Sequence, residues 1–147
     1  MRKRFTYRGK YKPANPEKYA GNVNNIVYRS SWERRFMVYC DNNEAITFWS
    51  SEELVIPYIS PVDRRQHKYY PDFVIKIQEE NKTRTIVIEV KPKKETKPPR
   101  KRSKITPRYL SEMKTWSINE AKWKYAKEFC EDRKWEFKIL TEDQLAQ

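Results

Sequence analysis

The stretch from Tyr69 to Lys91 constrains the fold of this chain more than any other, because apolar and polar residues alternate along it twice. The apolar residues in step are Phe73, Ile75 and Ile77 before a polar connection, and Ile86, Ile88 and Val90 after it. A period of two residues is that of a β-strand with one buried face. The stretch therefore predicts a β-hairpin, in which two antiparallel strands are neighbours in a sheet.

This hairpin brings two acidic residues together if its turn is centred between Glu80 and Asn81. In that register Asp72 lies opposite Glu89, and the alternation of side chains places Lys91 on the same face as Glu89. Opposed Cβ atoms are about 5 Å apart, and like charges at that distance destabilise a sheet. A divalent cation between the two carboxylates would turn the repulsion into a ligand set. The alternative is a solvated strand face with unrelated charges, since the connection has no glycine to fix the register.

A chain of 147 residues suits a single domain. Its 5 Trp, 10 Tyr and 6 Phe compensate for a low hydrophobic fraction of 37% and predict an aromatic-rich core. No apolar run reaches the roughly 18 residues of a membrane span, and the basic N-terminus lacks the apolar segment of a signal peptide. Cys40 and Cys130 are too few for a disulfide framework, and with one His they cannot form a zinc site of the usual spacing. We therefore expect a soluble protein of a reducing compartment, with no membrane partner.

The net charge of +12 is carried by two segments, residues 1–12 and 91–104, while the rest of the chain is nearly neutral. Basic segments of this kind are typical of nucleic-acid binding, because cations that neutralise phosphates release counterions. The alternative is a solubilising tail and loop, or contact with an acidic protein. The predicted DNA-binding residues are Arg2, Lys3, Arg4, Arg8, Lys10, Lys12, Lys93, Lys94, Arg100, Lys101, Arg102 and Lys104.

Residues 1–25 show no clear period and contain Pro13 and Pro16, which predicts an extended basic N-terminal arm. Aromatic rings are interleaved among its basic residues, and they either dock on the body of the protein or stack on bases. Residues 26–147 would then form the folded domain.

A helix is predicted from Ser31 to about Asp41, because its apolar residues fall on one face. Ser30 and Glu33 have the spacing of a capping box, in which the Glu33 carboxylate returns a hydrogen bond to the first turn. The apolar residues of this face are Trp32, Phe36, Tyr39 and Cys40.

The remaining elements complete an α/β domain, in which helices flank a mixed central sheet built around the hairpin. A helix between two strands predicts a right-handed crossover and a parallel pair. His67, in a loop, is either a proton shuttle or phosphate contact, or only a surface residue. The predicted elements are strands at 45–50 and 53–59, a loop at 60–68, a basic loop at 92–108, a short helix at 107–114, a helix opened by a Ser117–Glu120 capping box and ending near Arg133, a strand at 135–140 and a helical turn at 141–147.

The residues Pro71-Asp72 and Glu89-Val90-Lys91 resemble the signature of the PD-(D/E)XK nuclease superfamily. That resemblance implies a restriction-endonuclease-like fold and Mg²⁺-dependent phosphodiester hydrolysis, with Mn²⁺ as a substitute. It also implies that Asp72, Glu89 and the Val90 carbonyl hold the metal ion, while Lys91 orients water or offsets charge on the phosphate.

The same superfamily often takes a further glutamate from an early helix, in a sequence that Ser31-Trp32-Glu33-Arg34-Arg35 resembles. By that resemblance Glu33 is a catalytic residue and a metal ligand. The local alternative is the capping role already described.

Matches along nearly the whole chain resemble, more closely, the head completion nuclease family of T4-like tailed phages. This implies a DNA endonuclease of virion assembly that acts on double-stranded DNA in the host cytoplasm, with phage portal or head proteins as further partners and association with the virion. Two other functions stay open: a non-catalytic structural head or connector protein, and a resolvase-like or transposon-end nuclease, which would require a dimer. The matching segments are residues 7–13, 28–34, 56–63, 70–73, 89–92, 97–99 and 121–123.

Overall fold

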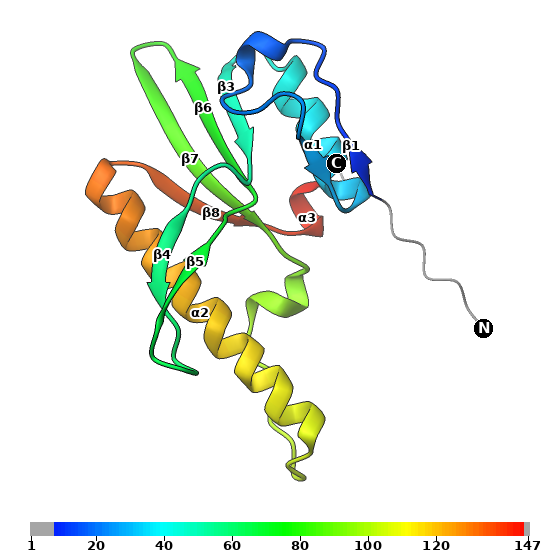
Figure 1. The fold of residues 1–147 in the computed structure, drawn as a ribbon, viewed down its shortest axis with the longest axis vertical. Helices are drawn as coiled ribbons and strands as arrows, with labels where there is room; N and C mark the ends of the chain where they lie inside the picture. The colour runs from blue at the N-terminus through cyan, green and yellow to red at the C-terminus, as the bar shows by residue number, and fades with distance from the viewer. Residues whose placement is uncertain (1–7, 146–147) are drawn as a thin grey trace, which may run out of the picture.

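The computed structural model describes residues 8–145 and contains one four-stranded sheet, two small two-stranded ladders and three α-helices (Figure 1). Among the helices of these residues, none combines the length and apolar character that crossing a bilayer requires. In chain order the elements are β1 (Gly9–Lys10), a 3-10 turn (Pro16–Lys18), β2 (Val27–Tyr28), α1 (Ser31–Asn42), β3 (Ile46–Ser51), β4 (Ile56–Ile59), β5 (Gln66–Tyr69), β6 (Phe73–Glu79), β7 (Lys82–Val90), a second 3-10 turn (Lys93–Thr96), α2 (Pro107–Arg133), β8 (Glu136–Leu140) and α3 (Glu142–Leu145).

The main sheet has the strand order β3-β6-β7-β8, with β8 parallel to β7 and the other pairs antiparallel. This confirms the predicted α/β class, the mixed sheet and the parallel pair after the long helix. Phe73 lies opposite Ile88 and Glu79 lies opposite Lys82, so the predicted hairpin and its register are confirmed. The predicted start of its first strand at Tyr69 was wrong, because β6 begins at Phe73 and Tyr69 ends β5. The register follows from burial, because a slip of one residue would turn every apolar side chain of β6 away from the core.

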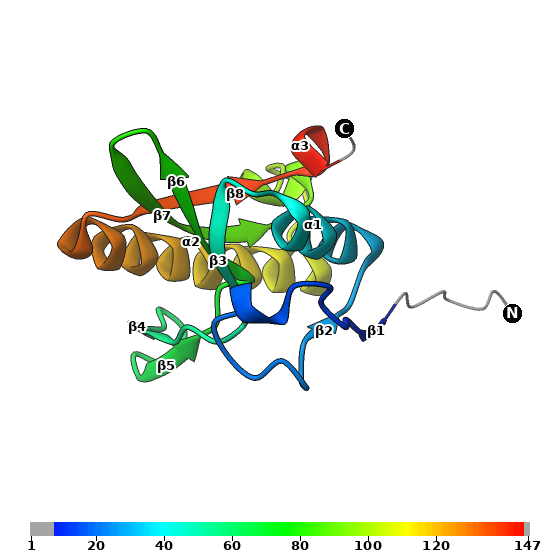
Figure 2. The same cartoon turned by 90° about the horizontal axis from the view of Figure 1, so that it is seen from above.

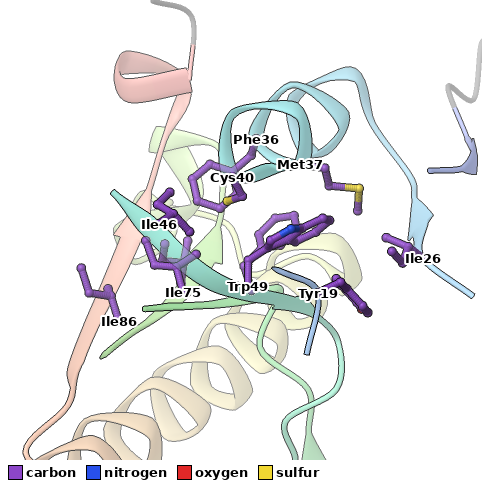
Figure 3. Close-up of a cluster of buried hydrophobic side chains, with 11 residues drawn as sticks. Tyr19, Ile26, Phe36, Met37, Cys40, Ile46, Trp49, Ile75 and Ile86 are labelled. Carbon is purple, nitrogen blue, oxygen red and sulfur yellow. The ribbon is translucent and has the colours of Figure 1, made fainter. Parts of the chain in front are cut away.

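Helices cover both faces of this sheet (Figure 2). On one face Phe36, Met37 and Cys40 of α1 pack against strand residues such as Ile75 and Ile86 (Figure 3). On the other face α2 contributes Trp123 and Ala126 to a second cluster, which also contains residues of β4, β5 and β8. Residues 85–89 of β7 are consecutively buried as a result, since neither face of this strand meets solvent.

The predicted loop at residues 60–68 was wrong at its carboxyl end. Gln66–Tyr69 form strand β5, which pairs with β4 and places Tyr58 opposite His67. Three of the four β5 residues are exposed, so no alternation of apolar residues marks the strand in the sequence. His67 is tied to Asp63, with 2.7 Å between Nε2 and Oδ2, and both side chains are partly exposed.

The predicted break between a helix at 107–114 and a helix opened by Ser117 was also wrong. A single helix, α2, runs from Pro107 to Arg133, and Thr106 is its N-cap, with Oγ1 accepting a hydrogen bond from Tyr109 N at 3.1 Å. The Ser117 hydroxyl donates instead to Lys114 O at 2.8 Å. A serine inside a helix satisfies its hydroxyl on the preceding turn, so the capping-box spacing alone did not indicate a helix start.

Asp41, a buried aspartate at the end of α1, is one of the groups that hold residues 8–25 on the domain, beside the packing of Tyr11 and Tyr19 on Trp49. Its carboxylate accepts hydrogen bonds from Tyr11 Oη at 2.6 Å, Ala14 N at 2.7 Å and Asn15 N at 2.9 Å. Lys18 Nζ donates to the carbonyl oxygens of the same helix end, including Cys40 O at 2.7 Å. Arg2, Lys3 and Arg4 lie outside the described residues, and the domain boundary at residue 25 stays a prediction.

Replacing Asp41 with alanine should lower the free energy of unfolding by about 2–4 kcal/mol near neutral pH, because three part-buried donors lose a charged, buried acceptor. Burial alone would raise the pKa of Asp41, but the Tyr11 hydroxyl and the backbone donors outweigh it and hold that pKa below its usual value. A lowered pKa in the folded state stabilises the protein at higher pH, and this stabilisation is lost as pH falls through the folded-state pKa. Urea denaturation should therefore show a smaller difference in acid. Asp132→Ala, at an exposed aspartate, is the control, and an equal loss there would contradict the assignment.

Candidate active site

Asp72, Glu89 and Lys91 meet at the open end of the β6–β7 hairpin. Asp72 directly precedes β6, and continuing the observed register places it opposite Glu89 near the end of β7. Asp72 Oδ2 accepts a hydrogen bond from Val90 N at 2.7 Å, and Lys91 Nζ lies 3.9 Å from Glu89 Oε2. The structure thus brings together the two acids and the lysine that the sequence placed there.

A fourth side chain, Tyr69 at the end of β5, holds the buried Glu89 carboxylate. Tyr69 is 3% exposed, and its hydroxyl donates to Glu89 Oε1 at 2.9 Å. The Lys122 ammonium of α2 lies 5.6 Å from the Tyr69 ring centroid, and its charge opposes the rise in the Glu89 pKa. One oxygen of Glu89 is therefore held by tyrosine, while the other faces Lys91.

Burial raises the pKa of Glu89 to about 8, with the neighbouring Asp72 charge as the next cause, while Tyr69 and Lys91 lower it. Burial is also the main reason why the pKa of Asp72 is raised. Two carboxyl groups that share a site titrate as a pair, and the second proton is held well above its ordinary pKa. At neutral pH the pair therefore retains a proton unless another positive charge replaces it.

Two further acids lie around Asp72. The pKa of Glu33 is raised, first by burial and then by the negative charge of Asp72. The Glu33 carboxyl group is therefore within electrostatic range of the site. Ser30 Oγ accepts from Glu33 N at 3.1 Å and lies 3.2 Å from Glu33 Oε2, which confirms the predicted N-cap. Glu52 follows β3, its backbone N donates to Asp72 O at 3.1 Å, and its carboxylate is paired with Arg29.

Sequence reasoning missed Tyr69, Glu52 and Arg29 as members of this environment. Glu52 approaches Asp72 only because β3 pairs with β6, a non-local contact that no spacing in the sequence indicates. Tyr69 would have been a candidate if β5 had been predicted, because a buried tyrosine hydroxyl needs a hydrogen-bond partner.

The oxygen donors of this site suit a hard divalent cation such as Mg²⁺, which is commonly bound by one or two carboxylates and completes its shell with water and phosphate. A cation would also offset the Asp72 charge, which after burial is the next cause of the raised Glu89 pKa. Among residues 8–145 no set of three or more His, Cys, Asp or Glu side chains is arranged as a metal cluster, so the carboxylates that the structure brings together here are the two of Asp72 and Glu89.

The predicted DNA-binding residues of the described chain lie mostly at the surface. Lys93 is engaged with α3, since its Nζ lies 3.1 Å from Asp143 Oδ2 and its backbone N donates to Glu142 Oε1. The exposed ones are Arg8, Lys10, Lys12, Lys93, Lys94, Arg100, Lys101, Arg102 and Lys104.

A carboxylate pair beside a lysine can hold a divalent cation next to a positive charge, which suits the hydrolysis of a phosphodiester. Residues 43–142 match the family described as TnsA-like endonuclease N terminal. The chain belongs to this family and is an endonuclease of the TnsA-like type. The match includes Asp72, Glu89 and Lys91, and it leaves Glu33 outside.

A curated relative covers nearly the whole chain. The head completion nuclease of Enterobacteria phage T4 is 41% identical over 145 residues, which are 96% of this chain and 95% of that protein. The resemblance predicted from the sequence is thereby confirmed. No solved structure matches the chain, so the restriction-endonuclease-like description of its fold stays a prediction.

Proposed function

We propose that this protein is an Mg²⁺-dependent DNA endonuclease that acts in the completion of phage heads. The observation that carries the proposal is the carboxylate pair of Asp72 and Glu89, held beside Lys91 at the end of the hairpin. The similarity to the head completion nuclease of phage T4 supports the proposal that the reaction takes place during virion assembly.

Asp72, Glu89 and the Val90 carbonyl are the residues that would hold the cation, with Mn²⁺ able to replace Mg²⁺. A bound divalent cation supplies Lewis-acid chemistry for phosphodiester hydrolysis. Asp72 and Glu89 contribute the negative charge that binds it, and Tyr69 fixes the orientation of Glu89. Glu33 is proposed as a further ligand, or as a group that orders water next to Asp72.

Lys91 is proposed as the catalytic cation. The Lys91 side chain is three-quarters buried, and its Nζ lies 3.9 Å from Glu89 Oε2, so its charge is already placed beside the pair. A positive charge in this position orients the attacking water or stabilises the charge that develops on the phosphate, and a preorganised group does so without rearrangement.

The substrate is proposed to be double-stranded DNA, bound through the basic residues of 1–12 and 91–104. Exposed lysine and arginine side chains on these segments would contact the phosphate backbone, with an affinity that falls as salt rises. Portal or head proteins are proposed as further partners, in the host cytoplasm during assembly and on the virion.

Incubation with supercoiled plasmid and Mg²⁺ tests this function. We expect nicking or linearisation that stops when a chelator is added and returns with Mn²⁺. Absence of cleavage over a range of both ions would favour a non-catalytic DNA-binding head protein. A four-way junction cut far faster than linear duplex would favour the resolvase-like alternative.

Replacing Tyr69 with phenylalanine should raise the Mg²⁺ concentration for half-maximal cleavage about 10- to 100-fold, because the group that orients Glu89 is lost. The Tyr69 hydroxyl also lowers the pKa of Glu89, so its removal should move the acidic limb of the pH profile upward. A metal titration at several pH values measures both effects. Tyr70→Phe, at the exposed neighbour, is the matched control, and equal behaviour of the two variants would contradict the role of Tyr69.

A further inference from the structure

A cavity of about 410 Å³ lies between the basic segment that follows the site and the amino-terminal half of α2. Figure 1 shows this segment running beside α2 after it leaves β7. Lys94 and Lys97 line one side of the cavity, and Thr115, Trp116 and Asn119 line the other. Lys94 follows Lys91 by three residues, so the same segment of chain leads from the site to the cavity.

Asn119 is the least expected residue in this lining. It is 9% exposed, and its side chain forms no hydrogen bond with another residue of the described chain, 8–145. Its amide is not among the fully enclosed polar atoms that lack a partner, so it is open to the cavity and available to a ligand there. A carboxamide offers a donor and an acceptor side by side, which is the pattern that pairs with the edge of a nucleobase.

Trp116 provides an aromatic surface in the same cavity. Its ring is held by Trp123, with centroids 5.8 Å apart and planes at 79°. An indole fixed in this way gives a stacking platform for a base, at little cost in side-chain freedom.

The charges of the lining suit one nucleotide better than a duplex. Lys94 and Lys97 are exposed cations at the mouth, whereas Glu95 and Glu112 also line the cavity. Glu112 accepts a hydrogen bond from Arg108 at 3.2 Å. A duplex backbone favours a uniformly basic surface, whereas one phosphate with one base is matched by two lysines, an amide and an indole.

We infer that this cavity binds one unpaired nucleotide of the DNA substrate beside the cleavage site. The inference rests on the proposed nuclease function and defines its substrate class as duplex DNA with a single-stranded tail or branch. Trp116 stacks on the base, Asn119 hydrogen-bonds its edge, and Lys94 and Lys97 contact its phosphate.

Binding in the presence of a chelator tests this site separately from cleavage. Blunt duplex is compared with the same duplex carrying a short single-stranded tail, in which one base is the fluorescent analogue 2-aminopurine. Wild type should bind the tailed duplex about tenfold more tightly and quench the 2-aminopurine, because one stacked base is gained. Asn119→Leu and Trp116→Leu should lose the preference and keep the affinity for blunt duplex.

The melting temperature of Asn119→Leu is measured in parallel, and a value close to that of wild type shows that loss of the preference does not come from misfolding. Asn24→Leu, at an exposed asparagine, is the control and should behave as wild type. Equal binding of both duplexes by wild type, or an unchanged preference in Asn119→Leu, would overturn the inference. Plasmid cleavage without a tail preference would remove this inference and leave the nuclease function standing. A tail preference without cleavage would leave the nucleotide-binding cavity standing and remove the nuclease function.

Discussion

Replacing Glu89 with glutamine should reduce DNA cleavage about a thousandfold or more, because the cation loses one of its two carboxylates. Glutamine keeps the size of the side chain and the oxygen that accepts from Tyr69, so the fold and this hydrogen bond should remain. Plasmid cleavage under single-turnover conditions measures the loss. Glu44→Gln, at an exposed glutamate, should cleave like wild type.

The same variant should be more stable than wild type when no metal is present. A carboxyl group whose pKa is raised on folding keeps its proton in the folded state, while the unfolded chain ionises near pH 4.3. Stability therefore falls as pH rises between the two pKa values, and Glu89→Gln should reduce that fall. Thermal unfolding with a chelator, from about pH 5 to pH 8, would show a difference that grows with pH.

A Glu89→Gln variant that still cleaves at half the wild-type rate would show that the carboxylate pair is not the catalytic centre. A variant that is inactive but also less stable at every pH would indicate a structural role for the Glu89 charge. Only inactivity together with equal or higher stability agrees with a ligand whose charge is unfavourable until metal is bound.

Lys91→Met should lower the turnover of cleavage about 100- to 1000-fold, because the preorganised ammonium beside the phosphate is lost. Removing this cation reduces the positive charge near Glu89, so the Mg²⁺ concentration for half-maximal activity should stay the same or fall. Turnover measured against Mg²⁺ concentration separates the two effects.

Lys138→Met, at an exposed lysine of β8, is the control for loss of one positive charge. If high Mg²⁺ restored the Lys91→Met variant, Lys91 would act only by supporting metal binding. If Lys138→Met lost as much activity, the effect of Lys91 would be one of net charge.

The hairpin and its acidic pair could be predicted because they depend on local information. Alternation fixed the strands, burial fixed the register, and together these placed Asp72 opposite Glu89. The last strand, β8, could be predicted equally well, because two strands of one sheet that are joined by a helix are commonly parallel.

The parts that failed depend on contacts that are distant in sequence. Strand β5 is polar and exposed, so only its pairing with β4 reveals it. The spacing of Ser117 and Glu120 is that of a helix start, but Thr106 and Pro107 had already begun the helix. Glu52 and Tyr69 reach the site through strand pairing and a tertiary hydrogen bond, which a linear pattern does not encode.

Crystals soaked in Mn²⁺ and measured for anomalous scattering test the central claim most directly. We predict one strong peak within about 2.3 Å of carboxylate oxygens from both Asp72 and Glu89, and its absence in Glu89→Gln. A peak bound elsewhere, or no peak at all, would contradict the account.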